Sequence, residues 1–271
     1  DTELSFNKSI KSWDERSSRG FSSEVLNAKK IAKITPTINE KFKYAYLSHH
    51  WAKVSEPKDI VKGLADSAKM KGVTFRQERV KSVCEKLNSI LINFDKGNTK
   101  YDAVVIAAGI NSVSLAKSLG DFLPMTAERG YNLTIPLSNI DIDIPIVFAD
   151  RGIVATSLES GLRIGGWAEY AHLSRPANPN YFDSIARISK DLFPGLNIEN
   201  ANYWMGSRPS TPDSVPVISK SLKIDRVFYN CGHGHYGLTH AATSANLLCS
   251  LIEGEQNSTE IKALSIDRFL Y

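Results

Sequence analysis

A short apolar segment near the end of the chain leads directly into a glycine-rich turn and a long apolar run. Residues 226–231 have the pattern of a buried strand, Gly-His-Gly-His-Tyr-Gly follows at residues 232–237, and residues 238–252 have that of a helix. Glycines at the first, third and sixth places allow a tight turn and a close approach of the backbone to a bound group. The helix start offers unpaired N–H donors and a partial positive charge. The segment therefore predicts a strand, a turn and a helix that together bind an anionic or electron-rich cofactor.

This unit has only part of a dinucleotide-binding fingerprint. That fingerprint continues into a second parallel strand, whose acidic residue, about 20 residues further on, holds a ribose. The sequence ends at Tyr271, and the nearest carboxylates, Glu253 and Glu255, directly follow the predicted helix. The segment by itself predicts no complete pyrophosphate-binding unit. A glycine-rich loop with a purely structural role is the alternative.

The bulk composition is that of an ordinary globular protein. With 271 residues, 42% of them hydrophobic and 23% charged, the chain can form one large domain or two interleaved ones. The net charge of +4 is spread along the sequence, which gives little support for a nucleic-acid partner. No run approaches the roughly 18 apolar residues that a membrane span requires. We therefore expect neither a nucleic-acid partner nor a membrane span.

The cysteines and the N-terminus suggest a compartment and an origin for the chain. Cys84, Cys231 and Cys249 are odd in number and far apart, which argues against a disulfide framework and a cysteine metal cluster and favours a reducing compartment. Residues 1–11 lack the regions of a signal peptide, and the sequence begins with Asp1 rather than Met. We expect the protein to be cytoplasmic. We also expect the chain to be a processed or truncated piece of a longer protein.

The apolar pattern divides the chain into two interwoven parts. A surface helix is expected over residues 57–72 and another helix over residues 181–192. Residues 103–108 are apolar on both faces, which is typical of a strand inside a sheet that helices cover on both sides. The remaining strands are expected over residues 73–75, 80–87, 89–95, 131–135, 145–148, 153–156 and 162–167. The predicted fold class is α/β with α+β character: an α/β layer of residues 56–126 and 205–271, and a mostly antiparallel layer of residues 1–55 and 127–204.

Four separated segments resemble the flavin-dependent D-amino acid oxidase superfamily. They are residues 104–109 (VVIAAG), 130–136 (GYNLTIP), 207–213 (SRPSTPD) and 232–239 (GHGHYGLT). Within that superfamily the chain is most similar to the D-amino acid dehydrogenases, with glycine oxidase and sarcosine oxidase as near relatives. The resemblance implies that the α/β layer binds FAD and that the antiparallel layer binds the substrate. Family members also have an N-terminal GxGxxG unit for the ADP part of FAD. No such unit precedes Asp1, so the FAD-binding domain is expected to be incomplete.

The resemblance implies a set of cofactor-binding residues. The glycine turn would lie along the flavin ring, so that its N–H groups and the helix dipole face the end of the ring where charge collects on reduction. Small residues at the end of the strand of residues 103–108 would let the cofactor approach, and a backbone group of Val80 would meet the adenine. The predicted cofactor-binding residues are Val80, Ala107, Ala108, Gly109, Gly232, His233, Gly234, His235, Tyr236, Gly237, Leu238 and Thr239.

The resemblance also implies substrate-binding residues, and it assigns no residue a catalytic role. Arg208 would grip a substrate carboxylate bidentately, Tyr131 would offer its hydroxyl to the same carboxylate, and His235 would line the pocket. A surface arginine that anchors a turn and a core tyrosine with a satisfied hydroxyl are the alternatives. A metal site at His233, His235 and His240 is not expected, because no acid lies near them in the sequence.

The implied activity is FAD-dependent oxidative deamination in amino acid catabolism. A D-amino or secondary amino acid would bind with a neutral amine and transfer a hydride from Cα to flavin N5, as a reaction of the longer parent protein. Electrons would pass to a quinone or another acceptor such as oxygen, and the protein would be cytoplasmic or peripheral to the inner membrane. A non-catalytic fragment that does not hold FAD and a histidine-dependent metalloenzyme are the alternatives.

Overall fold

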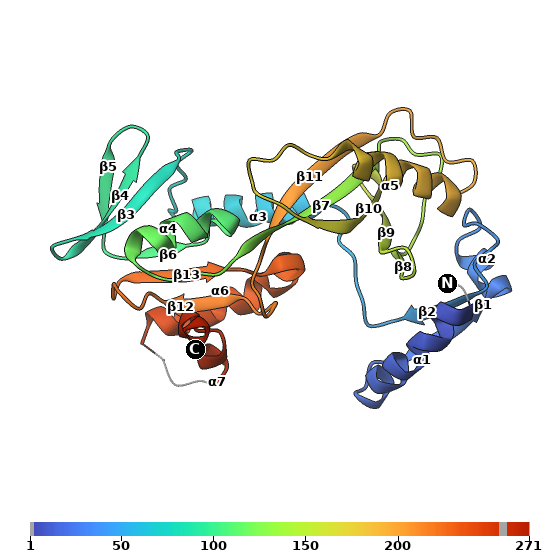
Figure 1. Ribbon diagram of the computed structural model, residues 1–271, viewed down its shortest axis with the longest axis horizontal. Coiled ribbons are helices and arrows are strands. Elements are labelled where there is room, and N and C mark those ends of the chain that lie inside the picture. The colour runs from blue at the N-terminus through green and yellow to red at the C-terminus, as the bar shows by residue number, and fades with distance from the viewer. Residues whose placement is uncertain (1–2, 255–258, 271) are drawn as a thin grey trace. The chain divides into compact units, whose positions relative to one another are not determined.

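The computed structural model describes residues 3–254 and 259–270 (Figure 1). The chain forms two compact units, each assembled from three separated stretches. Unit 1 comprises Asp1–Ala65, Gly130–Ala168 and Pro176–Gly206, and unit 2 comprises Asp66–Arg129, Glu169–Arg175 and Ser207–Tyr271. Their predicted roles in FAD and substrate binding stay predictions.

A five-stranded sheet, in the order β11-β7-β10-β9-β8, forms the frame of unit 1. Both β8 and β10 pair with β9 in antiparallel register, which confirms the antiparallel prediction for this region. The strand β11 was missed by the sequence prediction. The strands are β7 (Thr126–Ile135), β8 (Ile146–Phe148), β9 (Ile153–Leu158), β10 (Gly161–Tyr170) and β11 (Asn202–Ser210).

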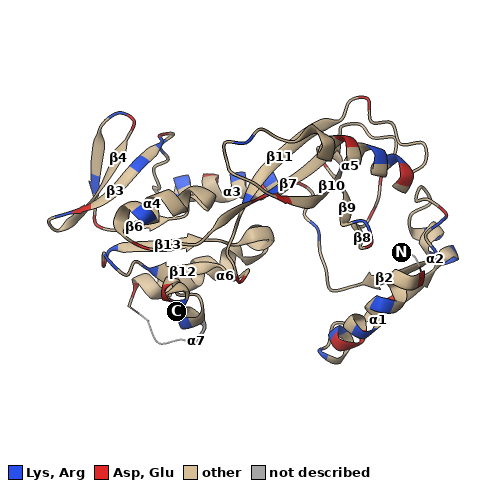
Figure 2. Ribbon diagram, viewed as in Figure 1, with Lys and Arg blue, Asp and Glu red and all other residues tan. Residues whose placement is uncertain are grey.

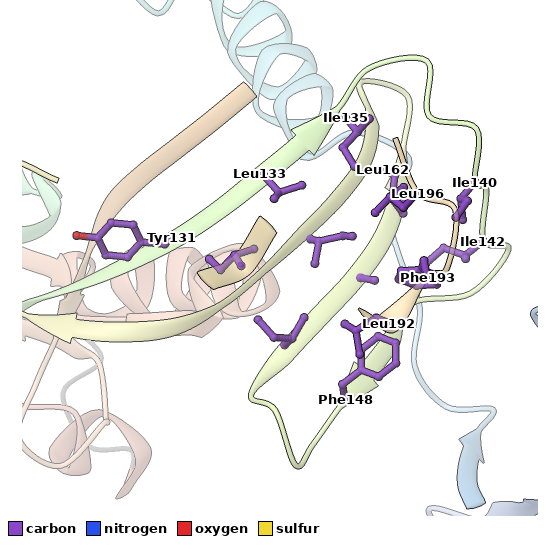
Figure 3. Close-up of a cluster of buried hydrophobic side chains, with 14 of the residues drawn as sticks. Tyr131, Leu133, Ile135, Ile140, Ile142, Phe148, Leu162, Leu192, Phe193 and Leu196 are labelled. Carbon is purple, nitrogen blue, oxygen red and sulfur yellow. The ribbon is translucent and has the colours of Figure 1, made fainter. Parts of the chain in front are cut away.

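The core of unit 1 lies on this sheet and includes the helix α5 (Pro179–Leu192). Its buried side chains, among them Leu133, Leu162 and Phe193, gather in one cluster (Figure 3). The helix starts at a proline in its first turn, where the Asn178 side chain accepts a hydrogen bond from the backbone, and it confirms the helix predicted over residues 181–192.

The first part of unit 1 contains more helix than the sequence prediction allowed. The helices α1 (Glu3–Ser18) and α2 (Ala28–Ile34) accompany an antiparallel pair, β1 (Ser23–Asn27) and β2 (Tyr44–Ser48). Aromatic stacking of Phe6 on Tyr44 and of Trp13 on Tyr46 fixes α1 against β2. The sequence prediction included no helix at residues 3–18, although Phe6, Ile10 and Trp13 recur there at helical spacing.

Unit 2 contains two three-stranded sheets and the glycine turn. In the first, β13 (Val227–Cys231) pairs antiparallel with β12 (Val217–Lys220) and parallel with β6 (Val104–Ile106). The second sheet is formed by β3 (Val80–Lys86), β4 (Ser89–Phe94) and β5 (Asn98–Tyr101).

Two helices pack on opposite faces of β13. Phe228 packs in a cluster with residues of α6 (Gly237–Ile252), whereas Val227 and Tyr229 pack in a cluster with residues of α4 (Ser112–Leu119). The remaining elements are α3 (Pro57–Met70), α7 (Thr259–Ala263) and the short 3-10 helices η1 (Gly109–Asn111), η2 (Gly234–Tyr236) and η3 (Ile266–Phe269).

Several sequence predictions differ from the structure. Residues 73–75 form no strand, and among the described strands β6 pairs only with β13, so that Val105 is 40% exposed rather than interior. An apolar sequence pattern indicates which residues favour burial, but it does not indicate whether the strand has a neighbour on one side or on both. The helix α3 lies where it was predicted, but its large apolar residues, including Val61 and Leu64, are exposed.

The distribution of charged residues and the length and polarity of the helices can be compared with the expected absence of a nucleic-acid partner and a membrane span. Lys and Arg residues are interspersed with Asp and Glu residues along the chain (Figure 2). Across residues 3–254 and 259–270, every helix is too short or too polar to cross a membrane.

Candidate functional site

The glycine turn after β13 has a backbone that only glycine adopts easily. Gly232 has φ 78° and Gly234 has φ 50°, both in the left-handed region. A Cβ added at Gly232 would lie 2.8 Å from Cγ2 of Thr211, so a side chain at this position would clash. The predicted strand, glycine turn and helix are confirmed by β13, η2 and α6.

The start of α6 is open to a ligand. Gly237, Leu238 and Thr239 are exposed, and the first turn of the helix contains no acidic residue that would repel an anion. Its first N–H groups have no carbonyl partner within the helix, and Leu238 and Tyr236 add exposed apolar surface. These features fit a flat, electron-rich ring such as a flavin, which needs both N–H donors and an apolar support.

The other predicted cofactor residues lie at the neighbouring strand end. Because β6 and β13 are parallel and Ile106 pairs with Tyr229, Ala107 to Gly109 and the glycine turn follow the carboxyl ends of adjacent strands. The N–H of Ala108 donates to Oγ of Ser112 at 3.1 Å, and space is open where a side chain at Gly109 would point. Val80 begins β3 in the other sheet of unit 2 and packs against the hydrophobic cluster that includes Ile106. The structure thus brings residues 107–109 close to the glycine turn, and the role of Val80 stays a prediction.

A buried carboxylate that the sequence prediction missed, Glu128 on β7, joins three polar residues of unit 2. Its Oε2 accepts a hydrogen bond from Oγ of Ser210 at 2.7 Å, and its Oε1 forms a short hydrogen bond with Nε2 of His235. Nη1 of Arg208 lies 3.7 Å from the same Oε1. Glu128 is 6% exposed, so its carboxylate is buried under the polar side chains that contact it. The predicted substrate residues Arg208 and His235 therefore share one carboxylate.

The environment of Glu128 keeps its carboxylate ionised. Burial alone raises the pKa of Glu128, but hydrogen bonds from Ser210 and His235, together with the charge of Arg208 and that of His235 when it is protonated, outweigh burial and lower it. Nη1 of Arg208 is buried without a hydrogen bond within the described part of the chain. Such a donor favours a ligand that supplies an acceptor, because an unpaired buried donor is unfavourable.

The histidines around the glycine turn have separate partners. Nε2 of His233 lies 2.9 Å from Oγ of Ser244 on α6, and burial, followed by the charge of His240, lowers the pKa of His233. His240 stacks on Tyr236. No acid lies near these residues in the sequence, but the fold brings Glu128 to His235 from 107 positions away. No group of three possible metal ligands occurs within residues 3–254 and 259–270.

Tyr131 is a core residue of unit 1. It is buried, its ring stacks on Tyr181 with centroids 4.7 Å apart, and its hydroxyl accepts a hydrogen bond from the N–H of Asn178 at 3.1 Å. This matches the core alternative that the sequence left open. Contact between Tyr131 and a substrate carboxylate stays a prediction.

Comparisons with known proteins identify relatives of this chain. The sequence model of the DAO family, described as FAD dependent oxidoreductase, matches residues 3–251. A D-amino acid dehydrogenase of Cereibacter sphaeroides is 34% identical over 217 residues, which cover 78% of this chain and 49% of that protein. A D-amino-acid oxidase of Bradyrhizobium diazoefficiens is 29% identical over 271 residues, which cover 95% of this chain and 62% of that protein.

The fold also matches solved structures. Glycine oxidase from Geobacillus kaustophilus superposes with a TM-score of 0.84 at 19% sequence identity, over 98% of this chain and 72% of that one. At this identity the likeness concerns the fold alone. The chain spans about half the length of the Cereibacter relative.

Proposed function

The chain belongs to the DAO family of FAD dependent oxidoreductases, and from this premise we propose that the whole protein oxidises D-amino acids, or secondary amino acids, to imino acids. Water then hydrolyses the imino acid, which completes an oxidative deamination. One observation supports the proposal: Arg208, whose guanidinium suits a carboxylate, lies 3.7 Å from Oε1 of Glu128, which also bonds to His235 of the exposed glycine turn.

FAD supplies the hydride acceptor when it is bound. The N–H groups at the start of α6 and the glycine turn of residues 232–237 would hold the flavin ring. A backbone group of Val80 would meet the adenine, and the small residues 107–109 would let the cofactor approach. The open surface at Leu238 and the absence of an acid in the first turn of α6 support this assignment.

Arg208 would bind the carboxylate of the substrate. Its guanidinium can donate two parallel hydrogen bonds to a carboxylate, and its side chain is 31% exposed, so it is restrained yet accessible. The carboxylate then orients Cα–H for hydride loss, and orientation is the main contribution that the protein makes in such a reaction.

The electron acceptor and the cellular location follow from the same proposal. Because the Cereibacter relative is named a dehydrogenase rather than an oxidase, we propose a quinone-type acceptor. We also propose a cytoplasmic protein that contacts the inner membrane peripherally. Reduction of a quinone analogue without oxygen consumption, together with recovery from the membrane fraction at low salt, is the expected result. Rapid oxygen consumption would instead indicate an oxidase.

The test uses the purified product of the complete open reading frame. We expect yellow protein with visible flavin bands that D-amino acids bleach under anaerobic conditions, and transfer of their electrons to an artificial dye. The matching L-amino acids are the control. A sample that stays colourless after addition of FAD would identify a non-catalytic protein, and flavin that no amino acid bleaches would exclude the proposed substrate class.

A further inference from the structure

The Glu128 carboxylate holds two candidate substrate-binding side chains near one oxygen atom. His235 of the glycine turn bonds to Oε1, and Nη1 of Arg208 on β11 lies 3.7 Å from that atom. Ser210, two residues after Arg208, donates to the other oxygen. Ser210 also forms an isolated antiparallel bridge with His233, so the backbone ties the end of β11 to the glycine turn. The relative position of Arg208 and His235 is therefore fixed by side chains and by backbone.

The carboxylate also determines where His235 carries its proton. An ionised carboxylate only accepts hydrogen bonds, so Nε2 of His235 must be the donor in this pair. In a neutral imidazole that donates from Nε2, Nδ1 is a proton acceptor. The His235 side chain is 52% exposed, and the described residues provide no hydrogen-bond partner for Nδ1. Nδ1 is thus accessible to a ligand.

An α-amino acid presents two charged groups on one carbon atom. Its carboxylate needs a cation or hydrogen-bond donors, and its ammonium group must lose a proton before the nitrogen lone pair can assist hydride loss from Cα. A site for this substrate class therefore benefits from a proton acceptor close to the carboxylate-binding group. His235 and Arg208 have this relationship through Oε1 of Glu128.

We propose that Glu128 is a positioning residue that fixes His235 as the acceptor of the ammonium proton of the substrate, an inference that rests on the proposed oxidation of D-amino acids. In this step an N–H bond of the ammonium group breaks, its electron pair stays on the nitrogen, and an Nδ1–H bond forms on His235. The positive charge moves to the imidazolium, where the Glu128 carboxylate forms a charge-assisted hydrogen bond with it. The substrate amine is left neutral and ready for oxidation.

The kinetic test compares Glu128→Gln with the wild-type flavoprotein across pH. The charged or titratable groups that face Glu128 are Arg208 from β11 and His235 from η2. At neutral pH the variant should lose about 100-fold or more in kcat/KM for a D-amino acid, within the usual range for proton transfer by a side chain. The loss should shrink as the pH rises until the substrate amine is neutral in solution. A loss of equal size at every pH, or no loss, would overturn the proposal.

The matched control is Glu169→Gln. Glu169 is also a buried carboxylate of unit 2, and it lies 3.4 Å from Nη1 of Arg129. Any loss that its removal causes should be independent of pH, because the proposal gives Glu169 no contact with the substrate. A pH-dependent loss of the same size in this variant would show that burial, rather than the Glu128 and His235 pair, is responsible.

A second readout does not depend on activity. NMR of ring-15N-labelled histidine in the substrate-free protein should show a protonated Nε2 for His235, whose signals are those lost in His235→Asn. Glu128→Gln should change the tautomer populations, because an amide can donate as well as accept. An Nδ1–H tautomer in the wild-type protein would refute the positioning role. A wild-type flavoprotein that oxidises no D-amino acid would instead refute the proposed function, while the NMR result would still report on Glu128.

Discussion

The hydroxyl of Tyr229 on β13 donates to Oδ2 of Asp121 at 2.7 Å, and both side chains are buried. The same oxygen accepts from Oγ of Ser221 at 2.5 Å, and Oδ1 accepts from the N–H of Leu222 at 3.1 Å. Asp121 follows α4, so one carboxylate ties this helix to β13 and to the turn before it. These bonds fix the strand that leads into the glycine turn.

Replacement of Tyr229 by Phe should lower the free energy of unfolding by about 1–3 kcal/mol, because the buried Asp121 loses a donor. Burial, followed by the bond to Asp121, raises the pKa of Tyr229 far above its ordinary value. The unfolded tyrosine ionises near pH 10, so the stability of the wild-type protein is complete below that pH and falls as the pH rises above it. Urea unfolding at neutral and alkaline pH measures both effects. The exposed Tyr170→Phe is the control, and equal stability of the two variants would contradict the prediction.

The three cysteines should differ in reactivity. Burial raises the pKa of Cys231 to about 12, whereas Cys84 and Cys249 are exposed. Because the thiolate is the reactive species, a thiol reagent at pH 8 should modify two cysteines quickly and the third only after denaturation. The double variant Cys84→Ser, Cys249→Ser should show no fast phase. A fast phase that remains in it would mean that Cys231 is accessible.

His233 should make the folded protein sensitive to mild acid. Its pKa is lowered from 6.5, first by burial and then by the charge of His240, so the unfolded chain binds a proton at a higher pH than the folded one. The free energy of unfolding should therefore fall as the pH drops below about 6.5. His233→Asn should be less stable at pH 8, because it loses the imidazole contact with Ser244, but should show a smaller decline between pH 7 and pH 5. The exposed His172→Asn should retain the decline of the wild-type protein, and an unchanged slope in His233→Asn would contradict the assignment.

The sequence predicted those elements whose conformation depends on neighbouring residues in the chain. The glycine turn was predictable because Gly232 and Gly234 need positive φ values that few other residues tolerate, and α5 because Pro194 and Gly195 closely follow an apolar period. Glu128 was missed because its partner His235 is 107 positions away, and nothing in its own neighbourhood distinguishes it from a solvated acid. Tyr131 was named as a candidate substrate residue, but its hydroxyl accepts a hydrogen bond from the N–H of Asn178. The sequence pattern of a tyrosine on a strand is the same whether its hydroxyl binds a ligand or a backbone group.

The C-terminal segment should stabilise the loop that follows Arg208. Nε of Arg268 donates to Oδ2 of Asp213 at 2.8 Å, and its Nη2 donates to the carbonyl of Val215 at 2.7 Å. Burial raises the pKa of Asp213, but the hydrogen bonds from Arg268 and Val215 outweigh burial and lower it. Stability from this pair is therefore present at neutral pH and is lost as the pH falls below the ordinary value of 3.8.

Replacement of Arg268 by Gln should make the loop around Asp213 more accessible. Hydrogen exchange of residues 211–216 should be faster in the variant, while exchange in unit 1 should stay the same. Arg268→Lys should restore only part of the protection, because an ammonium group does not reproduce the fork of donors. Arg226→Gln is the control, since the hydrogen bond of Arg226 to the carbonyl of Asn88 does not involve this loop. Unchanged hydrogen exchange in Arg268→Gln would show that the loop is stable without the contacts of Arg268.

Arg208 provides the most direct test of substrate binding. If its guanidinium binds the substrate carboxylate, Arg208→Ala should raise KM for D-amino acids at least about 30-fold, since removal of one partner of a charge-assisted pair costs about 2 kcal/mol or more. Arg208→Lys should recover a fraction of this loss, because lysine offers charge without the bidentate geometry. Arg187→Ala removes an exposed arginine of α5 and should leave KM unchanged. D-amino acid amides lack the carboxylate charge. Their KM should therefore differ little between the wild-type protein and Arg208→Ala. An unchanged KM in Arg208→Ala, with flavin still bound, would assign Arg208 to the support of Glu128 rather than to the substrate.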